Sequence, residues 1–156
     1  WNITALVVSV LSVLLSLYAL RQATTKNTSD MYLFFISQYA KEDMKLALRK
    51  LKDIKRGVYR LEQWESDMKN NLPKAFEYDE ARRLVKYFYD TLAYMKLEKL
   101  IEARFVRLIC LKKGAWLYLD TVEAMEKFFD SGYDKKPYAV IRDVCENLRK
   151  EGCCPP

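Results

Sequence analysis

The first twenty residues carry no charged side chain, and most of them are apolar. A helix over residues 1–20 would be about 30 Å long, at about 1.5 Å per residue, which matches the hydrocarbon core of a bilayer. A cleaved signal peptide would need a basic start and a small-residue cleavage site, and the run has neither. A buried core helix of this length would carry a polar face. The pattern therefore predicts a single transmembrane helix over residues 1–20.

Positive charge follows this run directly. Arg21 and Lys26 come just after it, and nothing positive precedes it. Because positively charged flanks stay on the cytoplasmic side of a membrane, the other 136 residues (156 − 20) are expected there. We therefore expect a single-pass protein of the cell membrane, with its N-terminus outside and its C-terminal domain in the cytoplasm.

Small residues recur at every third or fourth position of the predicted transmembrane helix. They form one stripe: Ala5, Ser9, Ser12, Ser16 and Ala19. Membrane helices associate where small residues let two backbones approach closely, and serine hydroxyls add hydrogen bonds between helices. The other interpretation is that each serine only bonds back to a carbonyl of its own helix. The stripe favours packing against another membrane helix.

Beyond residue 20 the chain has the period of amphipathic helices. Residues 21–30 are polar and are expected to connect the transmembrane helix to a helical domain over 31–150, which a Cys/Pro tail follows over 151–156. The clearest helix covers residues 41–61. Its apolar stripe consists of Ala47, Leu51, Ile54, Val58 and Leu61.

Further helices are predicted from about residue 79 to 95 and over 102–111, 115–129 and 137–150. Asp79 is a candidate N-cap, Gly114 a candidate C-terminal stop, and Pro137 fits a first helical position. No pair of strands with a hairpin signal is present. The expected fold is all-α, with one N-terminal transmembrane helix followed by a small cytoplasmic helical bundle.

The helix over 41–61 also carries a concentration of positive charge. Residues 41–60 hold eight basic and three acidic side chains, a net +5 (8 − 3), against +6 for the whole chain. Six basic residues recur at helical spacing nearly opposite the apolar stripe, and we call them the basic face: Lys41, Lys45, Arg49, Lys52, Arg56 and Arg60. Such a face is typical of the solvated side of an ordinary helix, and also of a surface for anionic lipid or an acidic partner.

The composition excludes several classes of function. Histidine is absent, which removes Ser-His-Asp and Cys-His catalysis, histidine-ligated zinc and the usual haem ligand. No glycine-rich phosphate loop or dinucleotide fingerprint is present, and acidic residues alternate with basic ones as in surface ion pairs. We expect no enzymatic activity, no cofactor, no small-molecule substrate and no nucleic-acid partner.

Four cysteines complete the candidate chemistry. Cys110 and Cys145 occupy apolar helix positions and are expected to be buried thiols. Cys153 and Cys154 are adjacent in the tail, after Gly152, where a redox role or soft metal ligation is one interpretation and an inert tail is the other.

One stretch of the chain carries a family resemblance. Residues 80–88 read Glu-Ala-Arg-Arg-Leu-Val-Lys-Tyr-Phe, and an aromatic helix around Trp116 follows. Together with the order of span, connector and helical domain, these motifs resemble a family of uncharacterised single-pass, membrane-anchored, all-helical proteins. The resemblance implies this architecture, and the family has no assigned activity to transfer.

The sequence favours a non-catalytic accessory or regulatory subunit of a membrane protein complex. Its partners would be integral membrane subunits of a hetero-complex, whose cytoplasmic face it would cover, with anionic lipid as a further candidate. The alternative is a membrane-tethered regulator that responds to redox state or metal through Cys153 and Cys154.

Overall fold

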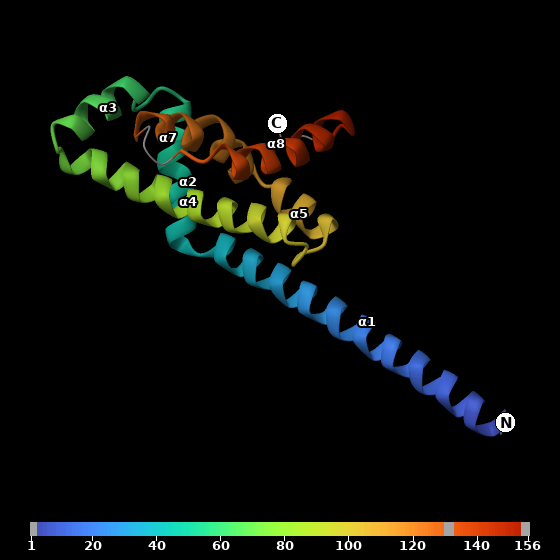
Figure 1. The fold of residues 1–156 in the computed structure, drawn as a ribbon. Helices are drawn as coiled ribbons and strands as arrows, with labels where there is room; N and C mark the ends of the chain where they lie inside the picture. Colours follow the sequence, from blue (N-terminus) through green and yellow to red (C-terminus); the bar gives the residue numbers. More distant parts are fainter. Residues whose placement is uncertain (1–2, 130–132, 154–156) are drawn as a thin grey trace.

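Helices are the only regular secondary structure among the residues that the structure describes. This computed structural model describes residues 3–129 and 133–153, with their side chains except at 3–11, 13, 21, 24 and 25. No strand occurs among these residues. The helices are α1 (Ile3–Ala40), α2 (Glu42–Lys55), α3 (Leu61–Lys69), α4 (Pro73–Leu97), α5 (Ala103–Cys110), α6 (Lys113–Leu117), the π-helical turn η1 (Tyr118–Val122), α7 (Glu123–Phe129) and α8 (Lys135–Lys150) (Figure 1). The expected all-α fold is confirmed.

Helix α1 is a single rod that projects from the domain. It contains 38 residues without a break, which corresponds to about 57 Å, and its N-terminal half extends away from the other helices (Figure 1). The polar residues 21–30, which were expected to connect two parts of the protein, belong to this helix. Across the described residues, no helix is both long enough and apolar enough to span a membrane.

The C-terminal half of α1 is packed against the domain. Phe35 is 1% exposed, and its ring meets that of Phe88 edge-on at 5.3 Å between centroids. The Tyr39 ring lies 5.8 Å from the same phenylalanine. Two turns before Phe35, the buried Thr28 donates a hydrogen bond from Oγ1 to Oε1 of Glu102 at 3.1 Å. Since these residues lie on one side of α1, the helix enters the domain as part of its core.

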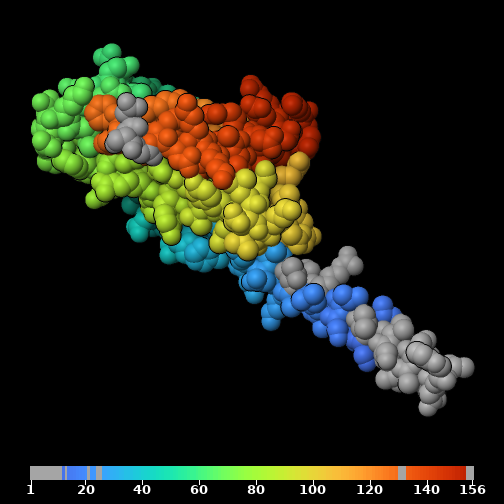
Figure 2. All heavy atoms as spheres, viewed as in Figure 1, coloured from blue at the N-terminus to red at the C-terminus, as the bar shows by residue number. Residues whose placement is uncertain are grey.

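The long helix α4 is the centre of the domain, with α2 packed on one side of it and α8 on another (Figures 1 and 2). The apolar stripe predicted for the helix over 41–61 is buried at Ala47, Leu51 and Ile54. Val58 is 73% exposed, because α2 ends at Lys55 and the chain turns at Gly57, which has a positive φ of 74°. The predicted burial of Val58 is therefore wrong.

Three predicted helix ends are also wrong. Helix α8 begins at Lys135 after the N-cap Asp134, so Pro137 is its third residue rather than its first. Helix α4 begins at Pro73, whose fixed φ suits a first helical position, so Asp79 is no N-cap but lies buried within the helix.

Gly114 does not end a helix but lies buried inside α6. A Cβ at this position would lie 2.7 Å from the Tyr89 hydroxyl, and the Gly114 N–H donates a hydrogen bond to the Tyr39 hydroxyl at 3.2 Å. Close approach, rather than chain termination, requires this glycine.

Four helices end in the same way. Each is followed by a residue with positive φ, and the next residue donates its N–H to the carbonyl five positions earlier at 2.9–3.0 Å. This arrangement satisfies the last carbonyls of a helix and favours glycine or asparagine. The residues at the left-handed position are Gly57, Asn71, Lys99 and Gly152. Lys99, which follows α4, is the exception to the expected residue types.

The packing of α1 generates a first prediction. Phe35→Ala should lower the free energy of unfolding by about 3–5 kcal/mol, because it removes a buried ring and leaves a cavity beside Phe88. The neighbouring Phe34 is 54% exposed and serves as the matched control, so that Phe34→Ala should cost far less. Denaturant unfolding of the full chain in a mild detergent measures both values. Equal losses in the two variants would contradict the docked position of α1.

Candidate interaction surfaces

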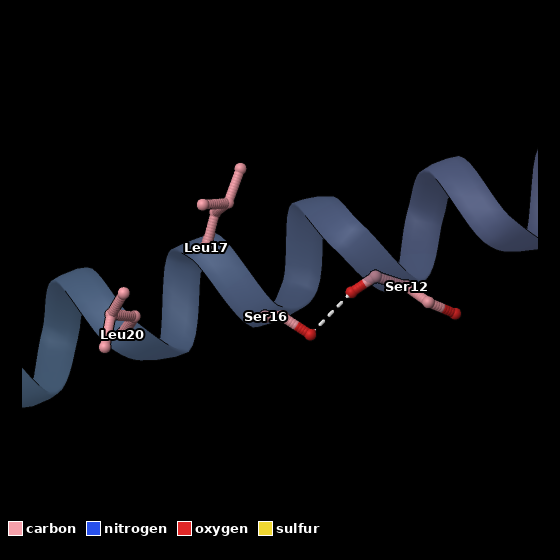
Figure 3. A pocket seen from close by; sticks show the side chains of 4 residues that line it. All are labelled: Ser12, Ser16, Leu17 and Leu20. Atoms are coloured by element: carbon pink, nitrogen blue, oxygen red, sulfur yellow. Dashed lines mark hydrogen bonds between the residues drawn. The ribbon is translucent and has the colours of Figure 1, made fainter.

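The small-residue stripe lies on the projecting half of α1. Ser12, Ser16 and Ala19 are exposed, while the side chains of Ala5 and Ser9 lie outside the described ones. Ser16 donates a hydrogen bond from Oγ to the Ser12 carbonyl at 2.8 Å, which is the interpretation in which a serine bonds back to its own helix (Figure 3). Ser12 and Ser16 also line a shallow surface pocket together with two leucines, Leu17 and Leu20.

Large apolar side chains surround this half of α1. Five of them are more than half exposed: Leu14, Leu15, Leu17, Tyr18 and Leu20. At about 100° per residue, these positions occupy the circumference of the helix except for an arc of about 140°, and that arc holds the small residues Ser12, Ser16 and Ala19. Their exposure shows that the described residues of this chain leave them largely uncovered, and surfaces of this kind mark sites of contact with a protein or a membrane.

The basic face is exposed at all six positions (41, 45, 49, 52, 56 and 60). It extends beyond α2, since Lys41 and Arg56 cap that helix and Arg60 precedes α3. Lys45 lies 3.3 Å from Glu42, measured from Nζ to Oε2, and this pair is itself exposed. The remaining five residues form no ion pair with any residue that the structure describes.

The two other lysines of α2 have different surroundings. Lys50 reaches Glu77 of α4 with Nζ 3.1 Å from Oε2, and Lys55 reaches Asp120 of η1 with Nζ 2.5 Å from Oδ2. Lysines that face the domain are thus neutralised by it, whereas those of the basic face are left to solvent. Repulsion between like charges at helical spacing costs a few tenths of a kcal/mol per pair, and an external anion would remove this cost.

A buried network of charged residues was not predicted from the sequence. Arg82 of α4 is 8% exposed and binds Asp79, with Nε 2.7 Å from Oδ1, and also Glu126 of α7. The sequence interpretation placed the carboxylates in surface ion pairs, and for Asp79 and Glu126 this is wrong because both are buried. The available signal was the position of Arg82 within the apolar stripe of α4. Removing one partner of such a buried ion pair strongly destabilises the folded protein, because the other charge stays buried without a partner.

Stacked tyrosines continue this network beneath η1. The ring of Tyr118 stacks on that of Tyr138 with 4.5 Å between centroids, and the Tyr118 hydroxyl donates a hydrogen bond to Asp90. Burial is the main reason that the pKa of Tyr118 lies well above its ordinary value, and the hydrogen bond to Asp90 raises it further. Burial, and then a bond to Glu123, raise the pKa of Tyr133 to about 12. These hydroxyls are therefore neutral near pH 7, and they serve as donors within the core.

The cysteines divide into two classes, as predicted for the buried pair. Cys110 and Cys145 are fully buried, and a hydrogen bond from one thiol to the other, together with burial, raises the pKa of Cys110. Cys153 is exposed after α8, with its Sγ 3.8 Å from the Glu151 carbonyl, and Cys154 lies outside the described residues. Within the described ranges, no cluster of three or more metal-binding side chains occurs. A redox or metal role for Cys153 and Cys154 stays a prediction.

Comparisons of this chain with protein-family models, with curated proteins and with solved structures find no match. The resemblance of residues 80–88 and of the helix around Trp116 to a membrane-anchored family therefore stays a prediction.

The two sets of lysines on α2 generate a second prediction. Lys52→Glu should raise the free energy of unfolding by about 0.5 kcal/mol at low ionic strength, because repulsion from Arg49 and Arg56 becomes attraction. Lys50→Glu carries the same change of charge but breaks the pair with Glu77, so it should lower stability. Denaturant unfolding of the full chain in detergent, at low and at high salt, measures both effects. A gain for Lys52→Glu that survives high salt would contradict an electrostatic origin.

Proposed function

We propose that this protein is a membrane-anchored, non-catalytic accessory subunit of a membrane protein complex. The observation that carries the proposal is the projecting half of α1, whose large apolar side chains are exposed around most of the helix, with the small residues Ser12, Ser16 and Ala19 on the remaining side. An apolar rod of this kind is stable where lipid or another membrane helix covers it. The uncharged run over residues 1–20 has the length that a bilayer requires.

The proposed orientation follows from charge. Arg21 and Lys26 come directly after the apolar run, which favours the cytoplasmic side for the domain and the outside for the N-terminus. The stripe containing Ser12 and Ser16 would pack against a helix of an integral membrane subunit. A serine that bonds to its own helix still presents a small surface, so close approach of a second helix remains available.

The basic face is proposed to bind an acidic segment of a partner protein rather than lipid. Lys41 follows Leu20 by 21 positions (41 − 20), which corresponds to about 30 Å along a continuous helix. Electrostatic attraction to a charged surface falls off within about 8 Å at physiological salt. If α1 stands close to the membrane normal, the basic face is too far from the headgroups to bind them, whereas a partner that protrudes from the membrane can reach it.

Membrane anchoring is tested by extraction. After an alkaline wash, the full chain should stay in the membrane fraction, and a Val8→Arg/Leu11→Arg variant, changed near the middle of the uncharged run, should be released, because each arginine at a helix centre costs about 2.5–3.5 kcal/mol of insertion. The control is Val58→Arg, which adds charge at an exposed position of the domain and should not change the fraction. Release of the unmodified chain would contradict the anchor.

The partner surface is tested by purification from membranes in a mild detergent. Replacing Arg49, Lys52 and Arg56 together by glutamate should abolish recovery of the partner, since the attraction becomes repulsion. The matched control makes the same change of charge on or beside α8, at Lys135, Lys136 and Arg149, which are exposed as well. Recovery of the same proteins with both variants would contradict the role of the basic face.

A further inference from the structure

The loop over residues 98–102, between α4 and α5, lies against α1. Glu102 accepts the hydrogen bond from Thr28 of α1, and the ring of Phe105 stacks on Tyr32 with 4.8 Å between centroids. Figure 1 shows this loop at the edge of the domain from which α1 projects, and in Figure 2 the same edge lies next to the departing helix. The loop therefore belongs to the part of the domain that faces the proposed anchor.

The tip of this loop combines an apolar and a basic side chain. Leu100 is 53% exposed, although it is a large apolar residue. Lys99 is exposed and makes no ion pair with the described residues, whereas the nearby Arg104 is paired with Glu102 at 2.7 Å between Nε and Oε2. Glu98 is a negative neighbour, and Lys26 adds a positive charge on the adjoining part of α1.

The backbone at Lys99 is unusual for its residue type. Its φ is +56°, and the equivalent positions at three other helix ends hold Gly57, Asn71 and Gly152. Glycine adopts this conformation at no steric cost, while lysine does not. The hydrogen bond from the Leu100 N–H to the Met95 carbonyl imposes this conformation, which glycine would adopt at lower cost, so the backbone does not explain why residue 99 is a lysine.

The position of the loop along α1 places it close to the surface of the proposed membrane. Thr28 follows Leu20 by eight positions (28 − 20), or about 12 Å of helix, and the headgroup layer covers the first 5–7 Å or so beyond the hydrocarbon core. The distance that remains between Thr28 and the headgroup layer is shorter than the Debye length of about 8 Å. A tilt of about 20°, which is average for membrane helices, narrows it further when it is directed towards the loop.

We propose that Lys99 and Leu100 contact the anionic headgroups of the membrane in which α1 is anchored. The proposal rests on the anchoring function proposed above and adds a second, separate contact with lipid. Lys99 supplies the attraction to anionic lipid, and Leu100 supplies an apolar side chain that enters the interface. Together with the transmembrane segment, this contact sets the tilt and rotation of the domain on the membrane.

The test uses the full chain in lipid nanodiscs of phosphatidylcholine, with or without phosphatidylserine. Hydrogen exchange at the amides of residues 98–102 should be slower when phosphatidylserine is present, by at most about fivefold, because one lysine near an anionic surface gives that effect and the exposed Glu98 opposes it. Lys99→Gly should remove this dependence on lipid charge and raise the unfolding midpoint by about 3 °C, since glycine relieves the backbone. The unfolding midpoint thus reports the effect of residue 99 on stability, and the exchange ratio reports its effect on lipid binding.

Two further variants complete the test. Leu100→Ser should speed exchange in the loop in both lipid compositions while leaving their ratio unchanged. Lys52→Gln removes a charge from the basic face and should leave the lipid effect intact; if it abolishes the effect, the basic face is the lipid contact and the proposal is wrong. A chain that enters nanodiscs but exchanges identically in both lipids overturns the loop contact alone. A chain that fails to enter nanodiscs overturns the loop contact and the anchor together.

Discussion

The packing of Phe35 and Tyr39 against Phe88 is the contact on which the rest of the structure depends. It places the last turns of α1 in the core of the domain, where Phe35 is almost completely buried. Because α1 continues from there to Ile3 without a break, this contact also fixes the direction in which the apolar half leaves the domain. An anchor joined in this way transmits its orientation, which a flexible polar connector would lose.

The distribution of charge follows from the same core. Carboxylates within or beside it bind Arg82, and acidic groups of α4 and η1 neutralise Lys50 and Lys55. The buried carboxylates Asp79 and Glu126 are thus paired with Arg82, and the basic face on the outer side of α2 carries an excess of positive charge. The two pairs made by Lys50 and Lys55 are partly or largely exposed, so each contributes about 1 kcal/mol or less to stability. Leaving the outer basic residues unpaired costs little in water, so they are free to serve binding.

Periodicity was sufficient to predict the all-helical fold and the buried stripe at Ala47, Leu51 and Ile54, because burial on one side of a helix imposes a period of 3.6 residues. Prediction from sequence failed at positions where contacts with distant parts of the chain determine the structure. Gly114 matched a helix stop, yet its lack of a side chain admits the hydroxyls of Tyr39 and Tyr89. The π-helical turn η1 depends on contacts with residues distant in sequence, so no local pattern indicates it, whereas the position of Arg82 within the apolar stripe of α4 did indicate its burial. The six residues of the basic face are exposed, and their role in binding stays a prediction.

The continuity of α1 has a thermodynamic consequence for binding. A domain on a flexible linker samples many orientations, and a partner that binds it must restrict all of them. In the anchored subunit proposed above, a domain carried on a continuous helix would have a defined height and direction, so a partner beside it in the membrane would meet the basic face at high effective concentration and with little loss of freedom. Under this proposal the same rigidity would make binding selective, because a partner whose acidic segment lies at another height could not reach Arg49 or Lys52. Helix length would then be a determinant of specificity alongside the side chains of the surface.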